Sequence, residues 1–340
     1  VGLMGFSMHA PTVQDMPVAV VGQSIEEAEQ TAAGLQESLG DVVDLQAFES
    51  VESADEAITD QDVVAVYVLP GVDGESAALH TASGAGMAQQ RAVSTIFTQI
   101  TDAQGVTLDQ QDIAALTDDD LQGSNSMYFA MAWIMAGFLI CAVLRGGAPH
   151  IRSLQQLLPL LLGWAVGMSV WLWFLFSVLI GAVHGNAWAL IGFGAATILA
   201  VSLATSLVTR TIGMAGLPVV IIVMMLAGVP ASGGGMSLYM VPEFFRSLHD
   251  VLPLAAATDA VRSLTYLGGA GVLQDLFVIV CWAAAALVLS VFVDKYMATR
   301  EPHPQPERFG AEPAALEPDP ALEDAAAGPE TERELVGASA

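Results

Sequence analysis

Apolar residues gather in five long runs in the second half of the chain. None of these runs contains Asp, Glu, Lys or Arg, and they cover residues 127–144, 157–183, 187–208, 212–229 and 276–293. An α-helix rises about 1.5 Å per residue and a bilayer core is about 30 Å thick, so roughly 20 apolar residues can cross it. The pattern predicts an α-helical polytopic membrane protein in which five transmembrane helices are present, within a membrane domain spanning residues 127–298.

Residues 10–126 have a different pattern, in which short apolar stretches alternate with polar helix starts. Three stretches are expected to form strands: PVAVVG (17–22), VVDLQAF (42–48) and VVAVYVL (63–69). Ser24 with Glu27, and Ser53 with Glu56, have the spacing of capping boxes that begin helices. A further helix is expected over residues 87–100. The sequence therefore predicts a small α/β domain.

The stretch between the fourth and fifth runs is half apolar and is interrupted by helix breakers. Pro230, Pro242, Pro253 and the three glycines 233–235 prevent a single helix from crossing a bilayer there. Two short amphipathic helices are expected instead, from 243 to 252 and from 259 to 267. Two charge pairs accompany them, Arg246 with Asp250 and Asp259 with Arg262. We expect a re-entrant or amphipathic element over residues 230–271; the alternative is a surface loop with no role in gating.

The basic residues predict an orientation. Five of them follow the first, third and fifth runs: Arg145, Arg152, Arg210, Lys295 and Arg300. Arg246 and Arg262, between the fourth and fifth runs, are the exceptions and have acidic neighbours. By the positive-inside rule these three regions face the cytoplasm, which puts residues 10–126 and the 230–271 element outside the cell. The composition, 54% hydrophobic and 14% charged, agrees with a protein embedded in a lipid bilayer.

The two ends of the sequence carry separate expectations. Residues 1–9, which include VGLMGFSM, resemble the outer end of a truncated first transmembrane helix, so the intact protein would have six helices and both termini inside. Residues 299–340 are rich in Pro, Ala and Glu and have too little apolar surface to fold alone. We expect them to form a disordered cytoplasmic tail.

Charge and motifs exclude several functions. Residues 10–126 hold 21 Asp and Glu against the single basic residue Arg91, a balance that repels nucleic acid. Lys295 is the only lysine in the chain, so a GxxxxGK[ST] loop for ATP is absent, as are GxSxG and HExxH. Asp118 and Asp120 imitate a calcium loop, but Phe129 stands where its last ligand would be, so a capped linker is expected. The sequence predicts no catalytic residue, cofactor or metal site.

Small residues in the second run suggest close helix packing. Gly163 and Gly167 in GWAVG form a small-xxx-small pair of the kind that lets two membrane helices approach.

Several motifs together resemble type 2 ABC transporter permeases. They are Gly228, Pro230, Ser232, Gly233 and Gly234 in a GxPxSGG pattern, VPEFF (241–245), which includes Pro242, Phe244 and Phe245, the Leu-Pro step at Pro253, and AVRSLTY (260–266), which includes Arg262. The resemblance extends over residues 10–298. It implies that these residues form an outer gate or re-entrant element.

The resemblance also implies partners and a location. It implies a permease subunit in a bacterial plasma membrane that pairs with a second permease copy and with ABC ATPase subunits, and that exports a hydrophobic or amphipathic substrate. The loop from 145 to 156 would contact the ATPase through Arg145, His150 and Arg152. The alternative is a membrane receptor or envelope scaffold without an ATPase, as in the similar YhgE and phage-infection-protein group.

Overall fold

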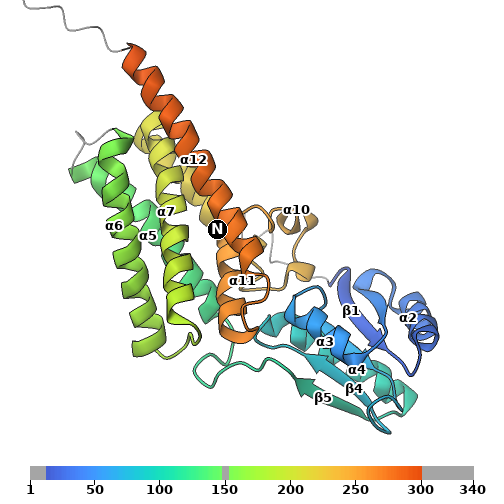
Figure 1. The fold of residues 1–340 in the computed structure, drawn as a ribbon. Coiled ribbons are helices and arrows are strands. Elements are labelled where there is room, and N and C mark those ends of the chain that lie inside the picture. Colours follow the sequence, from blue (N-terminus) through green and yellow to red (C-terminus); the bar gives the residue numbers. More distant parts are fainter. Residues whose placement is uncertain (1–12, 148–152, 301–340) are drawn as a thin grey trace, which may run out of the picture. The chain divides into compact units, whose positions relative to one another are not determined.

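The computed structural model describes residues 13–147 and 153–300. Within them the first part of the chain forms one mixed sheet of five strands in the order β2-β1-β3-β4-β5 (Figure 1). The strands are β1 (Met16–Val21), β2 (Val43–Phe48), β3 (Ala65–Val68), β4 (Ala77–Thr81) and β5 (Leu108–Asp112). β1 runs parallel to both β2 and β3, β3 and β4 are antiparallel, and β4 and β5 are parallel.

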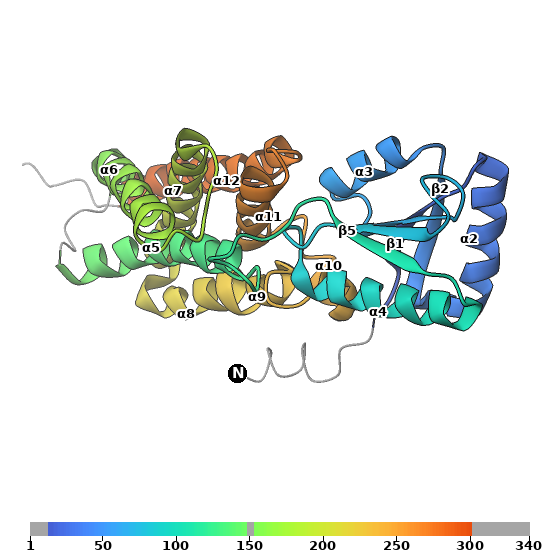
Figure 2. The same ribbon diagram turned by 90° about the horizontal axis from the view of Figure 1, so that it is seen from below.

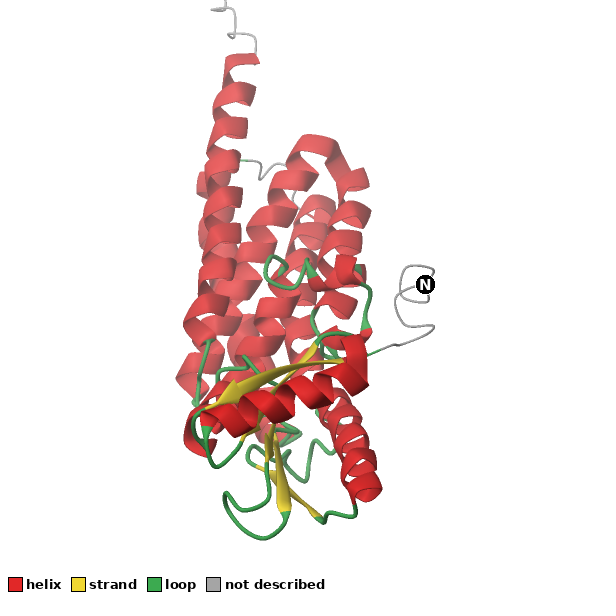
Figure 3. Cartoon of the chain, turned by 90° about the vertical axis from the view of Figure 1, so that its right-hand side faces the viewer, coloured by secondary structure: helices red, strands yellow, loops and turns green. Residues whose placement is uncertain are grey.

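Helices cover both faces of this sheet, because alternate strand residues are apolar on opposite sides. Val18 and Val20 point to the face packed by α2 (Ile25–Leu39) and α4 (Met87–Gln104), while Ala19 and Val21 pack with α3 (Val51–Thr59). Figure 2 shows α3 and α4 on opposite sides of the strands, and Figure 3 separates the yellow strands from the red helices. The α/β prediction for this part of the chain is confirmed.

The three predicted strands are found, and so are the predicted helices α2, after Ser24, and α4, after Gly86. Two points differ from the prediction: the start of α3, and two strands that were not predicted. Ser24 caps α2 by accepting from the Glu27 amide at 3.3 Å. The next helix begins earlier than predicted, because Ser50 and not Ser53 is its cap and accepts from the Ser53 amide at 3.2 Å. Strands β4 and β5 were not predicted, and β5 is a polar edge strand with the sequence LDQQD.

The rest of the described chain is helical. Its long helices are α5 (Asn125–Gly147), α6 (Leu154–Trp173), which continues through η2 (Phe174–Leu179), α7 (Ala187–Ile212) and α12 (Val272–Arg300). Shorter elements lie between the last two: η3 (Gly213–Ala215), α8 (Gly216–Ile221), η4 (Ile222–Leu226), α9 (Gly228–Ala231), η5 (Leu238–Met240), α10 (Glu243–Arg246) and α11 (Pro253–Tyr266). Helix α5 packs against α6, α7 and α11, and a shared apolar core joins them.

Four helical runs among the described residues are long and apolar enough to cross a membrane. They are Asn125–Gly147, Leu154–Leu179, Ala187–Ala231 and Val272–Tyr296. The prediction of a multi-pass helical membrane protein is thereby confirmed in its coarse form, and the count of five spans stays a prediction. The last run is longer than the predicted 276–293 and brings Asp275 and Asp294 into its first and last turns.

The third run holds 45 residues and unites the predicted spans 187–208 and 212–229. It is interrupted at Gly213, whose φ of 79° and ψ of −160° are not helical. A Cβ placed on Gly216 would lie 2.6 Å from Cγ1 of Val208, so the chain folds back on itself within eight residues. Only a residue without a side chain fits at that approach.

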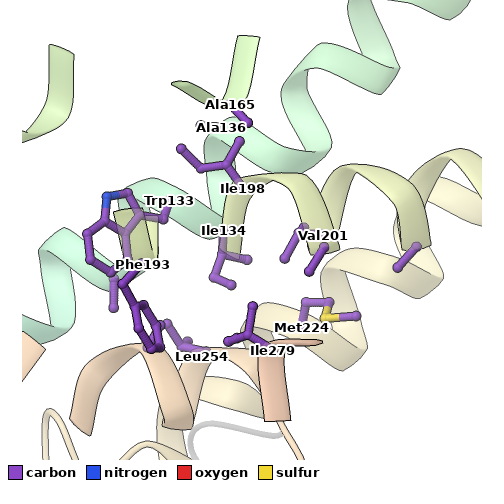
Figure 4. Close-up of a cluster of buried hydrophobic side chains, with 14 of the residues drawn as sticks. Trp133, Ile134, Ala136, Ala165, Phe193, Ile198, Val201, Met224, Leu254 and Ile279 are labelled. Atoms are coloured by element: carbon purple, nitrogen blue, oxygen red, sulfur yellow. The ribbon is translucent and has the colours of Figure 1, made fainter. Parts of the chain in front are cut away.

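The helices meet most closely at glycines other than the predicted pair. Figure 4 shows Trp133 beside Phe193 in the core, where the Trp133 ring also packs 4.4 Å from that of Phe129, centroid to centroid. A Cβ on Gly194 would lie 2.6 Å from both Ser169 Oγ and the Trp133 ring. By contrast, no described atom outside the local helix lies within 4 Å of a Cβ placed on Gly163 or Gly167, so this pair packs against no helix of the described chain.

Replacing Gly194 with Val should destabilise the bundle by about 1 to 3 kcal/mol, because the new side chain overlaps Trp133 and Ser169. Gly192→Val on the same helix is the matched control, since a Cβ there meets nothing described within 4 Å and the cost should stay below about 0.5 kcal/mol. Thermal unfolding in detergent measures both. Equal melting temperatures for the two variants would contradict this packing.

Candidate functional site

The segment from 228 to 267, here called the α9–α11 segment, has less helix at its centre than predicted and more at its end. Helix α10 covers only Glu243–Arg246, so the prediction of an amphipathic helix from 243 to 252 is wrong. Phe245 is 1% exposed and Phe244 63% exposed, and they therefore do not share a face. The predicted pair of Arg246 with Asp250 is also wrong, because Arg246 pairs with Asp15 at 3.3 Å.

Helix α11 is buried and does not lie on the surface. It begins at Pro253, six residues earlier than predicted, and every residue from Pro253 to Ser263 is buried. Small side chains at Ala255, Ala256 and Ala257 allow this approach to α5 and α7. A helix that carries Asp259 and Arg262 into such an environment must have both charges compensated.

The glycines and prolines of the segment are at tight contacts. Pro230 is buried in α9, and a Cβ on Gly228 would lie 3.0 Å from Cβ of Leu254 in α11. The Ser232 side chain is fully buried and its Oγ accepts from the Gly234 amide at 3.2 Å. Gly233 has a φ of 62°, and a Cβ on Gly234 would lie 2.5 Å from Met127. Substitution of either glycine therefore disturbs the local backbone or α5.

Asp259 is the centre of an ionic network on this segment. Its Oδ2 lies 3.1 Å from Nε2 of His249, and its Oδ1 lies 3.5 Å from Nη1 of Arg262, which confirms the predicted pairing with Arg262. Arg262 also donates from Nη2 to the Gly233 carbonyl at 2.8 Å. The carboxylate thus connects α11 both to the turn after α10 and, through Arg262, to the glycine run.

The geometry around His249 requires a charged ring. Its Nδ1 lies 2.9 Å from the Ala231 carbonyl, which can only accept, and its Nε2 faces the Asp259 carboxylate. Burial acts against the charge, but Asp259, the Ala231 carbonyl and Asp250 outweigh it and raise the pKa of His249 to about 9. The imidazolium is therefore the form at neutral pH.

The other buried ionisable groups nearby show the cost of desolvation. Burial lowers the pKa of Arg262, and the neighbouring carboxylates of Asp259 and Asp120 offset part of that effect. Burial raises the pKa of Asp120, although its carboxylate accepts from the Asn125 amide at 3.2 Å. Asp120 therefore caps α5, as expected for a capped linker. Separately, the described residues contain no group of three or more His, Cys, Asp or Glu able to hold a metal ion.

Polar contacts attach the segment to the sheet domain. Gln61 Nε2 donates to Ser263 Oγ at 3.0 Å, and the Gln14 amide donates to the Tyr239 carbonyl at 2.9 Å. The guanidinium of Arg246 lies 5.5 Å from the centre of the Tyr239 ring, a cation–π contact, in addition to its ion pair with Asp15. The network around Asp259 is thus continuous with the loops of the sheet domain.

A polar cavity of about 380 Å³ lies where these contacts meet. Its wall is formed by the loop before β3, including Asp60 and Asp62, and by Gln274 and Asp275 at the start of α12. The α9–α11 segment contributes its charged residues Arg246, His249, Asp250, Asp259 and Arg262. The wall has five Asp and three basic residues, and Asp259 is the only one of the five for which an ion pair with those basic residues is found in the described structure. The site can therefore accept polar or cationic groups, and its wall moves if the segment moves.

The predicted ATPase-contact loop is only partly described. Arg145 is half-buried in the last turns of α5, and His150 and Arg152 lie outside the described residues. On the far side of this loop the Leu154 amide, at the start of α6, donates to Asp294 Oδ2 at 3.0 Å. Asp294 also pairs with Arg210. These two contacts join the start of α6, the end of α7 and the last turns of α12.

Sequence reasoning missed His249, Asp275 and Asp294 as members of these clusters. His249, in the turn after α10, had no His or Cys neighbour at ligand spacing, and its partner Asp259 lies ten residues away in α11. Asp294 stands beside Lys295 and looks like an ordinary helix end. A useful signal would have been the position of each acidic residue at the edge of an apolar run, since such charges require a partner.

Comparison with protein-family models, with curated proteins and with solved structures found no match for this chain.

The His249 ion pair should make stability depend on pH. Because the folded pKa of about 9 is above the ordinary value of 6.5, the contribution is complete below pH 6.5 and is lost as the pH rises through about 9. The free energy of unfolding of the wild type should exceed that of His249→Gln below this pH window, and the difference should shrink by about 2 to 3 kcal/mol across it. His184→Gln, in an exposed loop, is the control. Parallel pH profiles for wild type and His249→Gln, measured by thermal unfolding, would refute the ion pair.

Proposed function

We propose that this chain is the membrane-spanning permease subunit of an ABC-type exporter in a bacterial plasma membrane. ATP hydrolysis would come from a separate ATPase, and the chain itself would carry no catalytic residue or cofactor. The observation that carries the proposal is a single helix, α12, that borders the polar cavity at Asp275 and carries Asp294 near the 145–156 loop. At 1.5 Å per residue these two positions are about 28 Å apart, close to the thickness of a bilayer core.

Contacts with the sheet domain support the predicted topology. Gln61 bonds to Ser263, and Asp15 pairs with Arg246, so the sheet domain and the α9–α11 segment belong on the same side of a membrane. Helices α5 and α6 together return the chain to its starting side. The run Ala187–Ala231 must then cross an even number of times, and the reversal at Gly213 fits two crossings. This supports five spans with residues 10–126 and the 299–340 tail on opposite sides, and the positive-inside rule would put the tail inside.

The proposed mechanism transmits motion along the helices. Closure of the ATPase subunits would move the 145–156 loop and with it the start of α6, whose Leu154 amide is bound by Asp294. The Asp294 pair with Arg210 would pass that movement to α7 and α12. At the outer side, movement of α12 would displace Asp275 and open the cavity that the α9–α11 segment closes.

An apolar groove supports the proposed substrate class. It has a volume of about 440 Å³ and lies between α7 and α12, with walls that include Leu207, Leu289 and Phe292. A groove of this kind accepts an alkyl chain from the bilayer, which fits a hydrophobic or amphipathic substrate. A second permease copy would complete the transport path.

The alternative function is a membrane receptor or envelope scaffold without an ATPase. The acidic domain favours it, because 21 Asp and Glu in residues 10–126 form a surface suited to a basic partner. In that case the helices would serve as an anchor.

Cysteine labelling tests the topology. In a chain with Cys141 and Cys281 replaced by Ser, we expect Glu75→Cys and Ser247→Cys to react with a membrane-impermeant maleimide on intact cells. Met214→Cys, beside the reversal, should react only after permeabilisation. Labelling of Glu75→Cys but not Ser247→Cys on intact cells would exclude the five-span arrangement.

Co-purification tests the exporter. The full-length protein isolated from its native membrane should carry a stoichiometric ATPase subunit with vanadate-sensitive turnover, and Arg145→Glu with Arg152→Glu should release it. Arg333→Glu, which changes the same charge in the 299–340 tail, should not. If the wild-type chain purifies alone and without turnover, the exporter is wrong and the receptor or scaffold is favoured.

A further inference from the structure

A second cavity, of about 260 Å³, is also lined by Arg262. Its wall comes from four parts of the chain: the start of α4, the loop at Gln122 and Gly123, the segment from Gly233 to Ser237, and Arg262 of α11. Arg262 borders both cavities, but the residues around this one are of a different kind.

The start of α4 offers unpaired amides to this cavity. Its N-cap is Gly86, which has no side chain to accept from them, and its first turn has no acidic residue. The amides of Met87, Ala88 and Gln89 have no acceptor among the described residues. The helix is 18 residues long, so these N–H groups carry the positive end of a full helix dipole.

The charged side chains in the wall are all basic. Arg91 and Arg262 line the cavity and no Asp or Glu does, in a chain with 36 acidic and 10 Lys and Arg residues. The Arg262 side chain is 7% exposed, and its Nε has no hydrogen-bond partner in the described structure. Within the same described ranges, Arg91 has no carboxylate at ion-pair distance. Arg262 is paired with Asp259 through Nη1, so the groups here that lack an anion are Arg91, the Nε of Arg262 and the helix N-terminus.

The glycine run adds backbone donors from a third direction. Neither the Gly235 amide nor the Met236 amide has an acceptor within residues 13–147 and 153–300. Glycine lets backbone N–H groups approach a ligand without a side chain between them. Donors that come from three elements suit an anion with several oxygens in a tetrahedral arrangement better than a planar carboxylate.

We propose that this cavity binds a phosphate group, held by the first-turn amides of α4, by Arg91 and Arg262, and by the amides of the glycine run. The volume leaves room for the phosphate and the first atoms of the molecule that carries it. The phosphate belongs either to a soluble ion or ester or to a lipid headgroup. The proposal is independent of the exporter function, because it requires neither an ATPase nor transport.

Binding is measured on the full chain in detergent, by equilibrium dialysis against radiolabelled inorganic phosphate. Arg91→Gln should weaken phosphate binding about tenfold, the loss of one charge-assisted contact. Ala88→Asp should abolish it, because a carboxylate on the second residue of α4 takes the place of the anion. That carboxylate complements the helix dipole, so the melting temperature should not fall. Ala103→Asp near the other end of α4 adds the same charge away from the cavity and should bind phosphate as wild type does.

A second arm separates the two sources. The chain is placed in nanodiscs of phosphatidylcholine with or without phosphatidic acid, and the lipids retained after delipidation are identified by native mass spectrometry. Retention of phosphatidic acid by wild type but not by Ala88→Asp identifies a lipid headgroup, and binding of inorganic phosphate alone identifies a soluble ligand. The proposal is overturned if wild type binds neither, or if Ala88→Asp and Arg91→Gln bind as wild type does.

Discussion

The position of α11 depends on the ionic network around Asp259. The helix brings a carboxylate and a guanidinium into a buried environment, and the penalty for desolvating them is several kcal/mol for each ion before compensation. His249 and Arg262 both face the carboxylate, while the Ala231 and Gly233 carbonyls accept from the two cations. Because each charge depends on the others, α11, the turn after α10 and the glycine run are held as one unit.

That unit is connected to the remainder of the molecule through two kinds of contact. The sheet domain is joined to it by polar contacts, the hydrogen bond from Gln61 to Ser263 and the exposed ion pair of Arg246 with Asp15. The long helices are joined to it by the packing of α11 against α5 and α7, and Trp282 of α12 donates to the Val251 carbonyl at 2.7 Å. Single hydrogen bonds of this kind contribute about 1 kcal/mol each, whereas breaking the buried ion network leaves an unpaired charge that costs about 3 to 5 kcal/mol. The segment can therefore separate from the sheet domain more easily than it can come apart internally, while α11 stays packed against α5 and α7.

The sequence predicted elements best where apolar periodicity and burial agree. β1 and β3 are fully buried and apolar, and the long apolar helices have no competing pattern. Prediction from the sequence failed for β5, an edge strand whose LDQQD sequence is exposed on both faces. It also failed for β4, which is short and buried by tertiary contacts. Periodicity also does not show that α11 is buried, because its many alanines are compatible with a surface or an interior.

For the candidate site, local spacing gave the pair Asp259 and Arg262, three residues apart on one helix. It could not give His249 or Asp294, whose partners Asp259 and Arg210 come from other elements, or the place of Asp275 in the cavity wall, because only the fold brings these residues together. The same limit applies to Gly163 and Gly167: the spacing is right for packing, but the close approaches fall at Gly137 and Gly194. Which glycine faces a neighbour is decided by the rotation of each helix.

The proposed exporter function has one central requirement, that the α9–α11 segment moves as a unit relative to the sheet domain when the proposed partner ATPase turns over. The most direct measurement is the distance between spin labels at Glu52→Cys in α3 and at Phe244→Cys in α10, by pulsed electron resonance, on the complex isolated with its ATPase. We predict that vanadate trapping shifts the distance distribution to longer values and that the shift is lost when Arg145→Glu and Arg152→Glu uncouple the ATPase. An identical distribution with and without vanadate would contradict the account.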